Sequence, residues 1–388
     1  MHLRHGLRRS PWQKFRRTLH SPFGGTHNGG GRLREICDFG SNPGNLRMFG
    51  YRPAVLAEDP ALVVALHGCT QTAEGYDLGS GWSTLAERYG FAVVFPEQQR
   101  SNNPNGCFNW FEPRHIRRDH GEPLSIRQMV EKFVADNRID RRRIFVTGLS
   151  AGGAMTSILL ACYPDIFSGG AIIAGLPYGA ASNVQQAFES MHQSPDRPAS
   201  EWGDLIRKAS PHRGPWPRVS VWHGDADKTV IPSNALEVLK QWTDVHDLPL
   251  SSSMKTRVDG FPREVWMDRT GEEVIEAYRI PNMGHGTPLA NTGSGNESCG
   301  APGPFFLPVG ISSSYHIAKF FGLTTARAER ESNIPLQYSR PEGEATEGSV
   351  LEGEVLERED EPTGSTPPLS GIESVINKAL RAAGLIKG

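Results

Sequence analysis

The sequence predicts an α/β fold with a doubly wound, mostly parallel sheet, and two observations support this. Short apolar runs typical of buried strands, such as ALVVALHG and FAVVFPE, alternate along the chain with amphipathic helical segments. The chain has 388 residues, of which 37% are hydrophobic, so it can bury one sizeable core. Because crossovers between parallel strands are right-handed, we expect helices on both faces of the sheet.

The expected elements follow one another in a regular order. Residues 33–40 and 45–53 should form a hairpin around the turn SNPGN. Strands are then expected at 61–68, 91–97, 143–150, 169–175, 218–224 and 273–280. Helices are expected at 80–90, 124–138, 151–164, 233–247 and 314–323.

The pattern also predicts how the chain divides into domains. Residues 1–31 are expected to form a basic, disordered tail with a glycine-rich linker, and residues 32–325 the folded α/β domain. Periodicity weakens between 176 and 217, which predicts an inserted helical cap. Residues 326–388 are acidic and rich in Pro, Glu and Gly, and are expected to form a disordered tail with a short amphipathic helix at its end.

Composition excludes several classes of function. A net charge of −2 argues against nucleic acid as the main partner. No apolar run approaches the length of a transmembrane segment, and no apolar segment of a signal peptide follows the basic N-terminus. The five cysteines show neither a disulfide framework nor the spacing of a zinc site, so we expect no zinc site built on cysteines.

A candidate nucleophile stands where an apolar strand turns into a helix. Gly148-Leu149-Ser150-Ala151-Gly152 fits the pattern G-x-S-x-G, which in this context indicates a nucleophile elbow. Such an elbow needs glycines so that the sharp turn can expose the serine hydroxyl. The alternative is an ordinary glycine-rich turn in which Ser150 only caps the helix.

A serine nucleophile needs a base, and the base needs an acid to orient it. Asp225 and Asp227 follow the strand at 218–224, and His285 follows the strand at 273–280. The order Ser, Asp, His is that of a nucleophile-elbow hydrolase, so we expect Asp227 as the acid, with Asp225 as the alternative. His67 and His223 are expected to shape loops.

The developing oxyanion needs two hydrogen-bond donors. We expect the backbone N–H of Ala151, directly after the nucleophile, and that of Cys69, in the loop after the strand at 61–68. Cys69 has two other interpretations: a small buried apolar residue, or a disulfide with Cys107, whose pairing the sequence does not settle.

Aromatic residues gather near the expected mouth of the site. Trp82, Phe108, Trp110 and Phe111 could form an apolar shelf for an acyl chain. Core packing is the equally open alternative for each of them.

Several stretches together resemble the polyhydroxybutyrate depolymerase family of esterases, within the α/β-hydrolase fold. They include LHGCTQTAEGYDLGSGWSTLAERYGFAVVFPEQQRSNNPNGCFNWF, GLSAGGAM, IIAGLPYG, WHGDAD and GHGTPL, spread over residues 37–323. The resemblance implies a Ser150–Asp227–His285 esterase without metal or cofactor. It also implies a substrate among poly(3-hydroxybutyrate) and its oligomers, or alternatively feruloyl or acetyl esters of plant polysaccharides.

The resemblance bears on location and partners as well. Many relatives are secreted, which implies an extracellular enzyme, whereas the basic N-terminus without an apolar segment favours the cytoplasm or non-standard export. The basic and acidic tails suggest a partner as well, since they could attach the protein to polymer granules. A non-catalytic binding scaffold is the rival from another class, and a complete triad in the right order argues against it.

Overall fold

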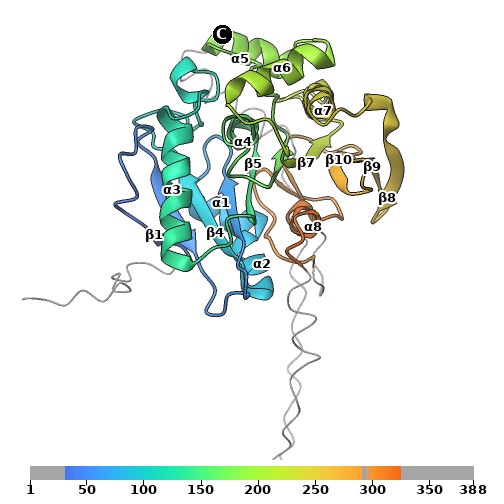
Figure 1. The fold of residues 1–388 in the computed structure, drawn as a ribbon. Coiled ribbons are helices and arrows are strands. Elements are labelled where there is room, and N and C mark those ends of the chain that lie inside the picture. Colours follow the sequence, from blue (N-terminus) through green and yellow to red (C-terminus); the bar gives the residue numbers. More distant parts are fainter. Residues whose placement is uncertain (1–30, 291–294, 296, 325–388) are drawn as a thin grey trace, which may run out of the picture.

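A ten-stranded sheet forms the centre of the computed structural model, which describes residues 31–290, 295 and 297–324 (Figure 1). The strand order is β1-β2-β4-β3-β5-β6-β7-β10-β9-β8. The expected tails at 1–31 and 326–388 lie outside the described residues, except for Gly31. No helix in the described ranges is long and apolar enough to cross a membrane.

The middle of the sheet is parallel, as the sequence predicts. Its strands are β4 (Ala92–Glu97), β3 (Leu62–Leu66), β5 (Ile144–Leu149), β6 (Gly169–Ile173), β7 (Arg218–Gly224) and β10 (Glu273–Ile280). Because parallel strands end at the same edge, the loops that follow them meet there.

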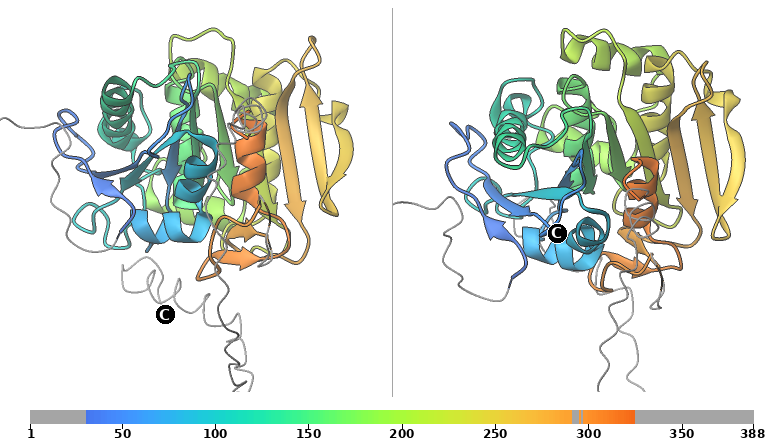
Figure 2. Two further views of the ribbon diagram at one scale, coloured as in Figure 1. Left: turned by 90° about the horizontal axis from the view of Figure 1, so that it is seen from below. Right: turned by 60° about the horizontal axis from the view of Figure 1, so that its bottom comes forward.

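Antiparallel strands close both sides of the sheet (Figure 2). On one side, β1 (Arg34–Glu35) and β2 (Arg47–Tyr51) form the expected hairpin. On the other, β8 (Met254–Val258) and β9 (Phe261–Met267) form a hairpin that the sequence analysis missed. A separate pair, β11 (Thr287–Leu289) and β12 (Phe306–Pro308), was missed as well.

Helices cover both faces, and alternate strand residues face the two layers. Leu62, Val64 and Leu66 belong to one buried cluster, whereas Val63 and Ala65 belong to the other. The first cluster includes residues of α3 (Gly121–Asn137), α4 (Ala151–Cys162), α6 (Ala199–Ala209) and α7 (Ser233–Val245). The second includes residues of α1 (Ala73–Ser80), α2 (Trp82–Tyr89) and α8 (Ser313–Phe320).

The region expected as a cap contains two helices with different surroundings. Both α5 (Val184–His192) and α6 connect β6 to β7. Helix α6 packs against α4 and α7, and its Trp202 indole donates a 2.6 Å hydrogen bond to Glu237 Oε2. Therefore α6 belongs to the helical layer, which it joins beside α5 (Figure 1). Helix α5 is the part whose residues reach the pocket that contains Ser150.

Candidate active site

The backbone at Ser150 has the conformation of a sharp turn. Ser150 joins β5 to α4 with φ 58° and ψ −117°, a region that costs a residue other than glycine on the order of 1–3 kcal/mol. Its side chain makes no hydrogen bond that caps α4. The geometry is therefore that of a nucleophile elbow and not of a serine-capped turn.

Two glycines of the motif allow this turn to sit close to the sheet. A Cβ atom on Gly148 would collide with the carbonyl of Gly152, and one on Gly152 would collide with the carbonyls of Leu66 and His67. Since any side chain would push α4 away from β3, the glycines at these two positions follow from close packing.

His285 and Asp227 are brought together by the loops after β10 and β7. His285 Nδ1 lies 2.7 Å from Asp227 Oδ2, and both side chains are buried. Asp225 is turned elsewhere: its Oδ1 accepts a 2.6 Å hydrogen bond from the backbone N–H of Asn282. The structure thus pairs His285 with Asp227, the expected acid, and leaves the alternative Asp225 outside the pair.

Several donors hold the Asp227 carboxylate. Oδ1 accepts hydrogen bonds from the backbone N–H groups of Thr229 (2.8 Å) and Val230 (3.0 Å), and Oδ2 lies 3.3 Å from Nε2 of buried His223. Burial alone would raise the pKa of Asp227, but the charge of His285 and hydrogen bonds from both histidines outweigh it, so the pKa lies well below its usual range. The carboxylate therefore stays ionised beside His285.

The sequence analysis assigned His223 to loop shape only. In the structure its Nε2 also lies 2.8 Å from the carbonyl of Val230, so the ring bridges the two ends of the loop that carries Asp227. The sequence places His223 four residues before Asp227, but spacing along a loop does not indicate whether two side chains are in contact.

Ser150 and His285 line one pocket at the carboxyl edge of the sheet. Polar side chains of its wall come from the segments 70–71 and 103–105. The apolar wall includes Trp110, Phe111, Phe188, Met191 and Phe305. The Phe305 ring stands edge-on to His285, with centroids 6.2 Å apart. Such a pocket can hold an apolar acyl group next to the serine hydroxyl.

Two of the expected substrate-binding aromatics are not in this pocket. Trp82 is fully buried in α2, where its ring meets Phe91 edge-on, and Phe108 is fully buried against the ring of His67. Both fill the core because their elements point them inward, so the expectation of substrate contact is wrong for them. Trp110 does line the pocket, as does Phe111.

The two expected oxyanion donors lie at the start of α4 and in the loop after β3. Ala151 is the first residue of α4, so its N–H belongs to the first-turn groups that lack an intrahelical acceptor. Cys69 lines the pocket and forms a disulfide with Cys107, so the disulfide, and not a small buried apolar residue, describes its side chain. The disulfide joins the loop after β3 to the loop that carries Trp110.

A buried carboxyl group supports the second of these loops. Glu122, in the first turn of α3, accepts hydrogen bonds from the backbone and side chain of Asn109 (2.9 and 2.7 Å) and from the Gln98 amide (2.7 Å). Burial raises the pKa of Glu122 to about 7, against the opposing effect of these donors. Sequence reasoning missed this group, since Glu122 stands before the helix expected at 124–138 and its neighbours in the sequence do not indicate burial.

Comparisons with known proteins agree with this geometry. A sequence model of the family described as "Esterase PHB depolymerase" matches residues 48–260. The poly(3-hydroxyalkanoate) depolymerase C of Paucimonas lemoignei is 47% identical over 292 residues, covering 75% of this chain and 70% of that protein. An acetylxylan esterase of Coprinopsis cinerea is 35% identical over 271 residues, covering 68% and 71%.

A solved structure is also similar. The acetyl xylan esterase from Aspergillus awamori superposes with a TM-score of 0.64 at 26% identity, covering 76% of this chain and 100% of that one. The three similar proteins share ester hydrolysis and differ in the ester named.

Proposed function

From the premise that this chain belongs to the esterase PHB depolymerase family, and is a carboxylic ester hydrolase of the α/β-hydrolase fold, we propose that it cleaves 3-hydroxyalkanoate polyesters or their oligomers. The reaction runs through Ser150, His285 and Asp227. The observation that carries the mechanism is the buried His285–Asp227 pair, whose histidine shares a pocket with the strained Ser150.

In the acylation half, the Ser150 hydroxyl attacks the ester carbonyl and His285 takes its proton. The ionised Asp227 stabilises the imidazolium that forms. The N–H groups of Ala151 and Cys69 donate to the oxyanion. When the tetrahedral intermediate collapses, His285 gives its proton to the leaving oxygen, and an alcohol end is released.

Deacylation repeats these roles with water. His285 takes a proton from a water molecule, whose oxygen attacks the acyl carbon. The second intermediate collapses when Ser150 Oγ leaves and receives the proton from His285. A carboxylic acid is released, and the site returns to its starting protonation.

Two observations support the polyester substrate. The relative that is named a poly(3-hydroxyalkanoate) depolymerase matches at 47% identity over three quarters of this chain. The pocket beside Ser150 has an apolar wall, which suits the short hydrocarbon groups of a 3-hydroxyalkanoate.

Feruloyl or acetyl esters of polysaccharides are the second candidate. It is favoured by the acetylxylan esterases among the relatives and by the solved acetyl xylan esterase. The catalytic residues would be the same, so only the pocket and the leaving alcohol distinguish the two candidates.

We further propose an extracellular location and association with polymer granules. The Cys69–Cys107 disulfide supports the location, because disulfides persist in oxidising compartments. Granule association would follow from a polymeric substrate, and its direct test is co-sedimentation of the protein with 3-hydroxybutyrate granules.

The test compares wild type, Ser150→Ala and a control, Ser101→Ala, whose serine is exposed on a loop. Each is incubated with 3-hydroxybutyrate oligomers, with methyl ferulate and with acetylated xylan, and acid release is followed. We expect Ser150→Ala to lose a factor of about 10⁴ or more in kcat on the oligomers, with the control unchanged.

Each outcome separates the candidates. Serine-dependent release only from the ferulate or the xylan would replace the polyester with a polysaccharide ester. Equal hydrolysis by wild type and Ser150→Ala would overturn the mechanism.

A further inference from the structure

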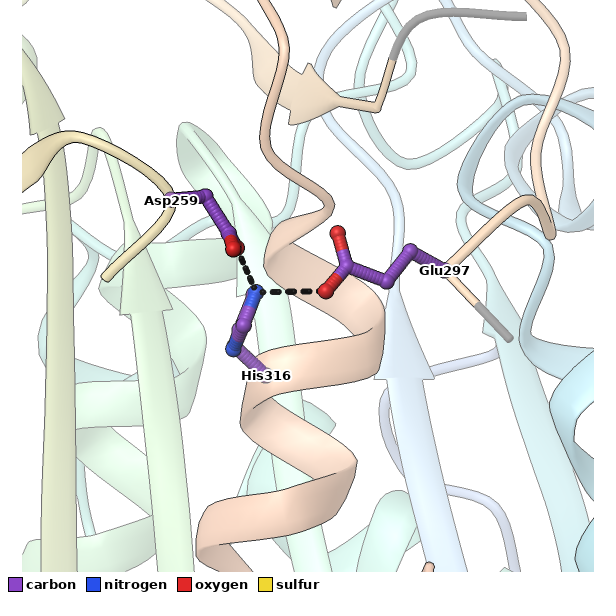
Figure 3. A group of neighbouring side chains, drawn as sticks. All are labelled: Asp259, Glu297 and His316. Carbon is purple, nitrogen blue, oxygen red and sulfur yellow. Dashed lines mark hydrogen bonds and ion pairs between the residues drawn. The ribbon is translucent and has the colours of Figure 1, made fainter. Parts of the chain in front are cut away.

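Three side chains outside the ester pocket converge on one point. His316 Nε2 lies 2.8 Å from Asp259 Oδ2 and 3.4 Å from Glu297 Oε1. These three atoms all lie within 4.8 Å of one another. Figure 3 shows both carboxylates pointing at the same ring nitrogen.

The three residues come from segments that are far apart in the sequence. Asp259 is in the turn between β8 and β9, with a φ of 50°. Glu297 lies between β11 and β12, and His316 is in the first turn of α8. The ring of His316 is 6% exposed, so it is fixed from behind by the core while its Nε2 faces outward.

The two carboxylates of this cluster face a single ring N–H of His316. A neutral imidazole carries one N–H, and at 2.8 Å that proton serves Asp259. Glu297 then faces a ring nitrogen and a second carboxylate.

Nearby cations compensate this negative charge only in part, with Lys319 acting on Glu297. Arg263, which lies close enough to affect His316, is already paired with Glu273 and Glu276 on β10. Lys319 is one turn further along α8 than His316. A cation placed between the two carboxylates would compensate both of them at once.

We propose that Asp259, Glu297 and His316 bind one divalent cation, with Zn²⁺ as the best match. One imidazole and two carboxylates are a donor set that zinc accepts, with water as a fourth ligand. Calcium is a poorer match, since it prefers six to eight oxygen ligands.

The two separations from His316 Nε2 suit a tetrahedral ion after a small adjustment. Bonds of about 2.0–2.2 Å from zinc to nitrogen and oxygen imply ligand atoms about 3.3–3.6 Å apart. The separation of 3.4 Å between His316 Nε2 and Glu297 Oε1 already fits. The side chain of Asp259 is 40% exposed on a turn, so it is free to retreat by the remaining half ångström or so. On binding, Nε2 gives its lone pair to the metal, and the ring proton is carried on Nδ1.

Bound at this point, the ion has a structural role. It would tie the β8–β9 turn and α8 to the segment between β11 and β12, which ends at the pocket residue Phe305. None of its three ligands lines the ester pocket. The inference is therefore independent of the proposed substrate and of the triad.

The first measurement uses the full chain, stripped with EDTA and dialysed. Zn²⁺ is titrated against a chromophoric chelator, and Co²⁺ is added to a second sample to record the visible bands of a tetrahedral site. We expect one ion per chain at this site. We also expect Tm to rise by about 5 °C at ~100-fold excess over Kd.

Variants assign the binding to this cluster. Glu297→Gln and His316→Gln should each weaken zinc binding by at least about tenfold and remove the Tm shift. His120→Gln changes an exposed histidine elsewhere and should keep both the zinc affinity and the Tm shift. It is the control for zinc that binds to histidines outside the cluster. If His316→Gln does not fold, Glu297→Gln decides, because that side chain is one-third exposed.

Equal zinc affinity and an equal Tm shift in wild type and Glu297→Gln would overturn the site, as would the absence of saturable binding in wild type. Hydrolysis of a short soluble ester is measured on the same metal-free samples. The zinc titration therefore tests the metal site, and the hydrolysis tests the proposed esterase function, so that either can fail without the other.

Discussion

At the scale of single residues, the two aspartates after β7 make a matched pair for testing the triad. Asp227→Asn should lower kcat by about 10⁴-fold, because an amide in this place no longer stabilises the imidazolium of His285. Asp225→Asn should stay close to wild type, since an amide oxygen can still accept from the Asn282 N–H. Steady-state kinetics on a p-nitrophenyl ester checks both, and a loss shared equally by the two variants would contradict the assignment.

The buried carboxyl of Glu122 predicts a pH dependence of stability. Its pKa is raised from 4.5 to about 7, so the folded state holds the proton more tightly than the unfolded state does. The free energy of unfolding contributed by Glu122 is therefore highest below about pH 4.5, falls as the pH rises to about 7, and then levels off. The change is on the order of 3 kcal/mol.

Denaturant unfolding at a series of pH values measures this slope. Glu122→Gln should flatten it between about pH 4.5 and 7, although the variant is less stable overall because it loses acceptors for the Asn109 and Gln98 donors. Glu58→Gln, which changes an exposed carboxyl elsewhere, should keep the slope. An unchanged slope in Glu122→Gln would show that another group titrates.

At the scale of elements, α5 is expected to set the acyl preference. Phe188 and Met191 extend from this helix into the apolar wall, while Glu189 is exposed on the same helix. Phe188→Ala should raise KM for 3-hydroxybutyrate oligomers about tenfold, with little change in kcat for a short acetate ester. Glu189→Ala is the control. A fall in kcat on both substrates would instead indicate a role in positioning the triad.

Some strands can be predicted from the sequence pattern and others cannot. The parallel strands are almost entirely buried, so continuous apolar runs mark them. Strand β8 carries Lys255, Thr256 and Arg257 and is mostly exposed, and β9 is only partly buried. Strand β8 is the edge of the sheet and β9 is its neighbour. Exposed strands at the side of a sheet need neither apolar runs nor clean alternation, so the sequence pattern does not indicate them.

At the scale of the whole molecule, residues 31–324 should suffice for folding and ester hydrolysis. The described residues within this range form both buried clusters. A chain limited to it should keep the Tm and the soluble-ester kcat of the full chain. Calorimetry and kinetics test this, and a large drop in Tm would show that the charged ends contribute to the fold. Co-sedimentation with 3-hydroxybutyrate granules, compared between the two chains, tests whether those ends contribute to granule association.

The sequence by itself determined what depends on local pattern and order along the chain. Alternating periodicity gave the α/β class, and the motif around Ser150 with a later Asp and His gave the candidate chemistry. The periodicity and the Ser150 motif depend only on neighbouring residues. The order Ser, Asp, His can be read along the chain because parallel strands bring their following loops to the same edge of the sheet.

Only the tertiary structure decided which side chains meet. It paired His285 with Asp227 instead of Asp225, joined Cys69 to Cys107, and buried Trp82 in the core instead of the pocket. It also brought Asp259, Glu297 and His316 together. These outcomes depend on packing between segments far apart in the chain, and a sequence motif carries no information on the direction in which such packing turns a side chain.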